Sequence, residues 1–110
     1  MSINKVILIG NVGIDPEIKV LSNDTKVAKI SVATSESYND KDGNKVEKTQ
    51  WHTIIAWRWM ADVCEKYIRK GSKVYIEGKL EYRTFEQNGQ QMKATDIISD
   101  KIEVLSSINQ

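Results

Sequence analysis

Apolar and polar residues alternate along most of the chain, and this period of two residues predicts β-strands that bury one face. The clearest stretch is 26–36, in which Ala28, Ile30 and Val32 fall on one face and mainly polar residues fall between them. Clusters of glycine, asparagine and aspartate separate the stretches, as turns do. The pattern predicts strands at residues 3–9, 17–21, 26–36, 49–57, 73–85 and 91–105.

A single segment, residues 58–70, has the period of an α-helix instead. Its apolar residues recur at helical spacing and form one stripe. Gly71 follows it, which is the usual residue just past a helix, and Arg69 and Lys70 suit the negative end of the helix dipole. The predicted stripe consists of Met60, Ala61, Cys64, Tyr67 and Ile68.

Besides a turn at residues 22–25, three segments predict turns. Residues 10–16 contain two glycines and the only proline, and glycine permits either positive φ or a close approach of two backbones. Residues 39–45 carry an Asp-Gly pair and residues 87–90 an Asn-Gly pair, both of which are typical of hairpin tips. Gly78 predicts a break or bend in the strand at 73–85.

The predicted order is three strands, one helix and two strands, with 17–21 as a short additional strand. Parallel sheets need a helix between most strands, and this order lacks them. We therefore expect an all-β protein: a five-stranded OB-fold Greek-key barrel with one helix between strands 3 and 4. At 110 residues the chain is expected to form one domain, 1–110.

The first predicted strand is apolar on both faces, because residues 6–9 are all aliphatic. In a small β-protein this pattern indicates core on one side and a partner subunit on the other. We expect Val6 and Leu8 to take part in a contact between subunits.

Amino-acid composition excludes fewer classes of function than the pattern of apolar and polar residues does. Sixteen basic and 15 acidic residues give a net charge of +1, so any positive surface must come from segregated charge. The single cysteine, Cys64, permits no internal disulfide and no cysteine-rich zinc pattern. No apolar run approaches membrane-spanning length, and the N-terminus lacks a signal peptide, so we expect a cytoplasmic protein with no membrane partner.

Trp51 and Trp57 are the most informative pair of residues. They lie six positions apart in one predicted strand, so both indoles fall on the same face, about 20 Å from one another. Wide aromatic faces along one sheet surface suit the stacking of unpaired bases of any sequence. Tyr38 and Phe85, each near a predicted hairpin tip, are candidates to extend the row. The pattern therefore points to single-stranded nucleic acid.

Two other classes of function compete with this interpretation. An enzyme, such as a nuclease using His52 or a Cys64–His52 pair, is disfavoured because there is no second histidine and no compact carboxylate cluster. A protein-interaction module, with the aromatic residues as interface residues, is the second alternative. We expect no catalytic residue, no metal and no cofactor.

Four blocks of the chain resemble bacterial single-stranded DNA-binding proteins, in the same order and along nearly the whole length. They are Asn4–Glu17, Ala33–Ser37, Trp51-His52 and Tyr67–Gly78. The resemblance implies an OB-fold that assembles as a homotetramer, with a dimer as the alternative. It also implies sequence-independent binding of single-stranded DNA during replication, recombination and repair.

The resemblance also implies roles for particular residues. It places His52 at a subunit contact, where Tyr75 is expected as well. Thr53 departs from the family, which often has arginine there, and this removes one expected phosphate contact. The implied DNA-binding residues are the aromatic Tyr38, Trp51, Trp57 and Phe85 and the basic Arg69, Lys70 and Arg83.

Several of these residues have a plainer alternative. Trp57 also fits the apolar stripe of the helix, Phe85 suits cross-strand packing, and Tyr38 suits a loop anchor. Arg69 and Lys70 suit a solvated helix end.

The end of the chain is the larger departure from the family. Family members commonly continue into a flexible linker and an acidic tip that recruits repair and replication enzymes, whereas this chain stops at Gln110. We expect a trimmed DNA-binding core or a naturally short form, with recruitment through such a tail not supported by this chain.

Overall fold

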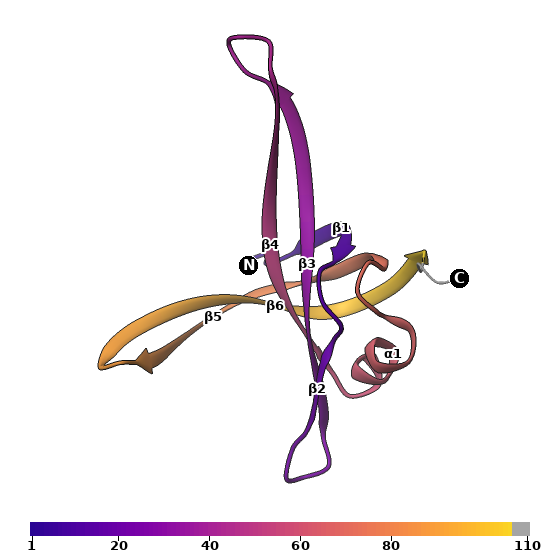
Figure 1. Cartoon of the computed structure of the whole chain (residues 1–110). Helices are drawn as coiled ribbons and strands as arrows, with labels where there is room; N and C mark the ends of the chain where they lie inside the picture. The colour runs from indigo at the N-terminus through magenta and orange to yellow at the C-terminus, as the bar shows by residue number, and fades with distance from the viewer. Residues whose placement is uncertain (107–110) are drawn as a thin grey trace.

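The computed structural model describes residues 1–106, and these form six strands and one helix (Figure 1). Every predicted strand is present, and the predicted helix lies between the fourth and fifth of them along the chain. The elements are β1 (Val6–Val12), β2 (Glu17–Val20), β3 (Lys26–Asn39), β4 (Lys45–Trp57), α1 (Trp59–Tyr67), β5 (Lys73–Gln87) and β6 (Gln90–Ser106).

One sheet contains the six strands in the order β1-β5-β6-β4-β3-β2, and β1 also pairs with β3. That extra pairing, which includes Val12 opposite Val32, closes β1, β5, β6, β4 and β3 into a five-stranded barrel. The short β2 lies outside the ring, paired with β3 only. Because α1 falls between the third and fourth barrel strands, the predicted OB-fold is confirmed.

The barrel interior holds the residues that the alternating pattern assigned to it. On β3 the buried positions are every second residue, and on β4 they are Ile54 and Ala56. The helix packs against β3, β4 and β6 and adds its own buried stripe to the same core. The buried core consists of Val12, Ala28, Ile30, Val32, Ile54, Ala56, Ala61, Cys64, Ile68, Val74, Ile76, Ile97 and Ile102.

Cys64, the only cysteine, lies in this core, and burial raises the pKa of its thiol from 9.0 to about 11. Its contribution to stability is fully present below pH 9.0 and is lost as the pH rises toward about 11, because the unfolded thiol ionises first. We expect guanidinium unfolding midpoints to fall over this range, and to fall less in Cys64→Ala. Equal pH dependence in both proteins would contradict this assignment.

The first strand begins and ends three residues later than predicted, at Val6 and Val12. Gly10, expected in a turn, lies inside the strand opposite Val74. A Cβ at Gly10 would lie 2.3 Å from the carbonyl oxygen of Ala33. The glycine therefore marks a close approach of two backbones where the barrel closes, and not a turn.

The helix ends at Tyr67, three residues before the predicted end. Ile68 takes an extended backbone with a fully buried side chain, and the N–H of Gly71 donates to the carbonyl of Val12 at 2.8 Å. The chain leaves the helix early because this contact with β1 requires it, which the helical period does not reveal. Tyr67, expected on the buried stripe, is exposed.

Two long hairpins extend beyond the barrel as arms (Figure 1). We term the β3–β4 hairpin the first arm and the β5–β6 hairpin the second arm. Their strands stay paired to the turns at residues 40–44 and 88–89, farther than the predicted strand 26–36 reached. At the tips, Gly43 and Gly89 adopt positive φ values of 81° and 79°, as the predicted hairpin turns require.

The two arms separate at a defined point. Strands β4 and β6 pair in parallel at two positions only, Ile54 with Ile97 and Ile55 with Ile98. On the N-terminal side of these pairs each strand continues into its own arm. We term this divergence point the fork.

Candidate nucleic-acid interface

Trp51 and Trp57 lie on the outer face of β4, as their spacing predicted. The intervening Ile54 and Ala56 point into the core, so alternation turns both indoles away from it. Trp51 is 62% exposed, whereas Trp57 is half-buried. The indole of Trp51 lies over Gly13, where a Cβ would come within 2.5 Å of a ring carbon. A side chain at position 13 would collide with the indole, so the glycine leaves the space in which Trp51 lies.

Phe85 belongs to the same outer face, although it lies on the other arm. Ile98 of β6 pairs with Ile55 of β4, so these side chains share a face with Trp51. Met92 lies an even number of residues before Ile98 and pairs with Phe85 of β5. The fork therefore carries Trp51 on the first arm and Phe85 on the second, both on one continuous outer face.

Tyr38 does not share this face of the ribbon. It pairs with Val46 near the tip of the first arm and is exposed. Trp51 pairs with Ala33, an odd number of residues from Tyr38, and no bulge interrupts the register between them. Alternation therefore places Tyr38 on the opposite face of the ribbon from Trp51, and it does not extend that row.

Arg83 lies two residues from Phe85 on the same face of β5. Its guanidinium carbon is 5.4 Å from the centroid of the Phe85 ring, a cation–π distance. Its Nε donates a 2.8 Å hydrogen bond to Oδ2 of Asp96. Within residues 1–106 its terminal nitrogens make no hydrogen bond to protein, so they are available to a phosphate.

Asp96 is the residue that sequence reasoning missed. It directly precedes Ile97, the first residue of β6 paired with β4, so it sits at the fork. Its side chain is only 8% exposed, and Oδ1 has no hydrogen-bond partner among the described residues. Thr53 precedes Ile54 at the corresponding position of β4. The only indication of Asp96 in the sequence is an acidic residue that lies between Thr95 and the apolar pair Ile97-Ile98.

Arg69 and Lys70 lie elsewhere in the molecule. Nη1 of Arg69 donates to the carbonyl oxygens of Glu65 and Ile68, at 2.7 and 2.8 Å, so the guanidinium caps the C-terminal end of α1. The backbone N–H of Lys70 donates to Oδ1 of Asp15. Figure 1 shows α1 far from the tips of both arms. The structure does not bring these two residues together with the exposed aromatics and favours their interpretation as a helix end.

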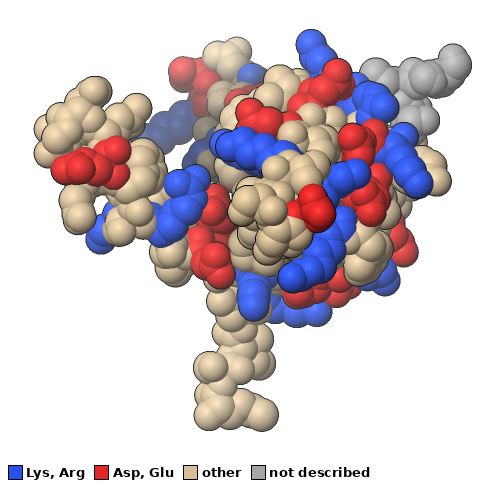
Figure 2. Space-filling view, turned by 90° about the horizontal axis from the view of Figure 1, so that it is seen from below, with Lys and Arg blue, Asp and Glu red and all other residues tan. Residues whose placement is uncertain are grey.

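Charge is mixed on the face of the molecule seen from below. Seen from below, basic and acidic residues intermingle, and neither sign forms a continuous patch on that face (Figure 2). This agrees with 16 basic and 15 acidic residues in the whole chain. On this face, attraction to a polyanion would come from individually placed cations and not from a broad positive patch.

The outer face of β1 carries exposed apolar residues. Val6 and Leu8, the residues expected at a subunit contact, pack against the core instead. Ile7 and Ile9 are 57% and 51% exposed on the opposite face. Since strand residues alternate, the apolar side that faces away from the core belongs to Ile7 and Ile9, whereas a role of Val6 and Leu8 in a subunit contact stays a prediction.

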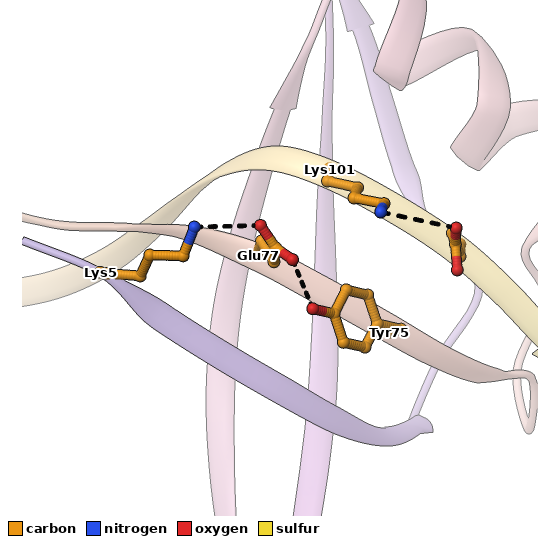
Figure 3. A network of polar contacts seen from close by, with 5 residues as sticks. Lys5, Tyr75, Glu77 and Lys101 are labelled. Carbon is orange, nitrogen blue, oxygen red and sulfur yellow. Dashed lines mark hydrogen bonds and ion pairs between the residues drawn. The ribbon is translucent and has the colours of Figure 1, made fainter.

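Tyr75 lies beside Ile9 and belongs to a polar network (Figure 3). Its hydroxyl donates to Oε2 of Glu77, whose Oε1 lies 3.1 Å from Nζ of Lys5. The Lys101 ammonium lies 5.9 Å from the Tyr75 ring centroid. The Glu77 carboxylate raises the pKa of Tyr75, while the Tyr75 hydroxyl and then Lys5 lower the pKa of Glu77. On this face the apolar Ile7 and Ile9 of β1 thus lie opposite the polar Glu77 and Tyr75 of β5.

The geometry gives no support to catalysis by His52. Its Nε2 lies 2.9 Å from Oγ1 of Thr34, and Cys64 is enclosed in the core. Residues 1–106 contain no group of three or more metal-ligating side chains placed to hold an ion. Among the same residues, no helix has the length and apolar character needed to cross a membrane.

Comparison with known proteins decides the family. A model of the single-strand binding protein family matches residues 3–105. The chain belongs to this family. The homologues that the chain matches are DNA-binding proteins and not enzymes, which argues against the nuclease alternative.

Curated relatives of this single-strand binding chain include two bacterial proteins. It is 41% identical to the single-stranded DNA-binding protein of Neisseria meningitidis serogroup A, over all of this chain and 64% of that protein. It is also 41% identical to single-stranded DNA-binding protein 1 of Chlorobaculum tepidum, over 96% of this chain and 66% of that protein. The chain therefore spans about two thirds of the length of these curated relatives.

A solved structure supports the fold assignment. The SSB of Plasmodium falciparum, solved in complex with ssDNA, superposes with a TM-score of 0.88 at 37% identity. The match covers 96% of this chain and 97% of that chain, so the barrel and both arms belong to a shared architecture.

Proposed function

We propose that this single-strand binding protein holds single-stranded DNA without sequence preference, by stacking bases on Trp51 and Phe85 and contacting phosphates with Arg83. The single observation that carries the proposal is the fork, whose arms offer outward-facing aromatic residues from one continuous face. Trp57, half-buried on that face, and Tyr38, exposed on the other side of the first arm, extend the contact. The protein protects exposed strands during replication, recombination and repair.

The chemistry of these side chains explains the lack of sequence preference. Every base has a π-face, so stacking on an aromatic ring contributes about 1–3 kcal/mol per base whatever the sequence. Contacts from arginine to phosphates add a term that weakens with salt. The Plasmodium falciparum protein, whose fold is shared, was solved with ssDNA, which supports the same ligand for this chain.

A titration with oligo-dT, followed by tryptophan emission at low and high salt, tests the proposal. Bases stacked on Trp51 should quench its emission strongly and saturably, whereas duplex DNA of equal length should not. The slope of log K against log salt gives the number of phosphates engaged, at about 0.7 per phosphate for single strands. Absence of binding at low salt would leave an OB-fold that serves as a protein-interaction module.

We also propose that copies of this chain associate through the outer face of β1 and β5, as a homotetramer or, alternatively, a dimer. The exposed Ile7 and Ile9 and the adjacent Tyr75 support this surface, and His52 is the further contact that the family resemblance implies. Light scattering at micromolar concentration tests it, and the mass of one subunit would contradict it. We place the protein in the bacterial cytoplasm, acting on chromosomal, plasmid or phage DNA.

A further inference from the structure

We propose that Asp96 is a positioning residue of the single-stranded DNA site: it holds Arg83 across the ring of Phe85, so that one nucleotide is bound by both. The base stacks on Phe85 and the phosphate meets Arg83. The inference rests on the proposed function and deepens it, because it names a residue with no role in the sequence interpretation. It also predicts that an acidic side chain strengthens the binding of a polyanion.

Register brings the three side chains together on one face. Arg83 is opposite Ala94 across the β5–β6 pair, and Asp96 lies two residues beyond Ala94 on the same side of β6. Phe85 lies two residues from Arg83 in the other direction along β5. Arg83 therefore reaches Asp96 on one side and Phe85 on the other, within one ladder of the second arm.

The hydrogen-bond geometry fixes the orientation of the guanidinium. Arg83 contacts Oδ2 of Asp96 through Nε, at 2.8 Å, and not through its terminal nitrogens. Contact through Nε leaves both terminal nitrogens free to form paired hydrogen bonds to a phosphate. The Asp96 carboxylate thus fixes Nε of Arg83 and leaves the two terminal nitrogens accessible to the ligand.

The stacking geometry supplies the second half of the nucleotide site. The guanidinium of Arg83 covers one face of Phe85, with 5.4 Å between the guanidinium carbon and the ring centroid. Phe85 is still 39% exposed, so a base has room to stack on the ring. A base on the uncovered face would complete a stack of base, phenyl ring and guanidinium.

A contribution to the folding stability does not account well for the burial of the Asp96 carboxylate. Its Oδ1 is buried without a hydrogen-bond partner among residues 1–106, which is an unfavourable arrangement for a carboxylate. A largely buried ion pair that satisfies only one of two carboxylate oxygens is weak support for the fold. What the carboxylate does achieve is to order a half-exposed arginine before the ligand arrives.

Asp96→Asn and Glu81→Gln form a matched pair of variants. Glu81 lies directly opposite Asp96 across the β5–β6 pair, is exposed, and makes no hydrogen bond or ion pair within residues 1–106. Each variant removes one negative charge from the same place, so charge alone would tighten DNA binding equally in both. Only Asp96→Asn also replaces the charged acceptor of the Arg83 Nε–H with a neutral amide, which weakens the contact that holds Arg83.

The positioning role predicts opposite results for the two variants. Asp96→Asn should weaken binding of labelled oligo-dT by about threefold to tenfold, since Arg83 must then lose side-chain freedom on binding. The salt slope should fall by up to about 0.7, the value of one phosphate contact. Glu81→Gln should bind as tightly as the wild type or more tightly, and Asp96→Glu should restore part of the loss.

Two further variants at Arg83 separate positioning from a structural effect. In an Arg83→Gln background, Asp96→Asn should cause no additional loss of affinity, because the residue it positions is already gone. Arg83→Lys keeps the charge but has no Nε–H to donate to Asp96, and it should weaken binding by a similar factor. Since Arg83 is half-exposed, Arg83→Lys tests the inference even where Asp96→Asn fails to fold.

Unchanged or tighter binding by a folded Asp96→Asn protein would overturn the inference and would mean that Asp96 competes with phosphate for Arg83. A loss that persists undiminished in the Arg83→Gln background, or unchanged affinity of Arg83→Lys, would overturn it as well. Failure of the wild-type protein to bind oligo-dT would instead refute the proposed function, and the inference with it. The two failures are thus distinguishable in one series of titrations.

Discussion

Replacing Trp51 with alanine should weaken binding of oligo-dT by about 1–3 kcal/mol, or roughly fivefold to 150-fold in Kd. The indole is 62% exposed on the outer face of the first arm and is held against Gly13, so it offers a base a wide surface that is already ordered. Alanine removes the surface on which the base stacks. Anisotropy of a fluorescein-labelled oligonucleotide measures the loss without relying on tryptophan emission.

Trp59 provides the matched control for this experiment. It is also 62% exposed, but it lies at the start of α1 and away from both arms, so Trp59→Ala should leave affinity unchanged. Gly13→Ala tests the same site without removing an aromatic residue, because its Cβ would come within 2.5 Å of the Trp51 ring and displace it. Wild-type affinity in a folded Trp51→Ala protein would remove Trp51 from the site.

Replacing Gly78 with alanine should lower the free energy of unfolding by about 1–3 kcal/mol or more. A Cβ at this position would lie 2.3 Å from the carbonyl oxygen of Ile98 and 3.0 Å from a methyl carbon of Ile97. The carbonyl belongs to backbone in the β5–β6 ladder, which has to shift to accommodate the methyl group. Urea unfolding at a fixed protein concentration measures the change in stability.

The neighbouring Lys79 serves as the control for Gly78. Its side chain is exposed on the next position of the same strand, and Lys79→Ala should change stability by no more than about 0.5 kcal/mol. The register of the β5–β6 pair shifts between Glu77 and Gly78. Equal urea midpoints for Gly78→Ala and Lys79→Ala would show that the two strands separate easily at this shift. The close approach would then not be a requirement of the fold.

The barrel was predictable from the sequence because alternation and element order are local signals. The stretch 26–36 needed only its own residues to be recognised as a strand, and the order of strands and helix then selected the OB-fold. Two boundaries were wrong where a distant segment decided the geometry. Gly10 stays in a strand because Ala33 approaches it, and α1 ends early because Gly71 bonds to Val12.

For the candidate site, the sequence predicted only which residues of the same strand share a face. The spacing of Trp51 and Trp57 placed both on one face without knowledge of the fold. The relation of Phe85 to Trp51 depends on the parallel register between β4 and β6, which no local pattern contains. The same register brings Asp96 to the fork. In the sequence this residue resembles any acidic residue of a strand, and only the structure shows its contact with Arg83.

The barrel contains the packed core, and the two arms extend away from it. A Cβ at Gly43 or at Gly89 would meet no atom within 4 Å, so the tips at residues 40–44 and 88–89 bear none of the core packing. Inserting residues in such tips costs little closure entropy. Growth or shrinkage of the two hairpins would therefore alter the reach of the arms, while the barrel that carries them stays the same.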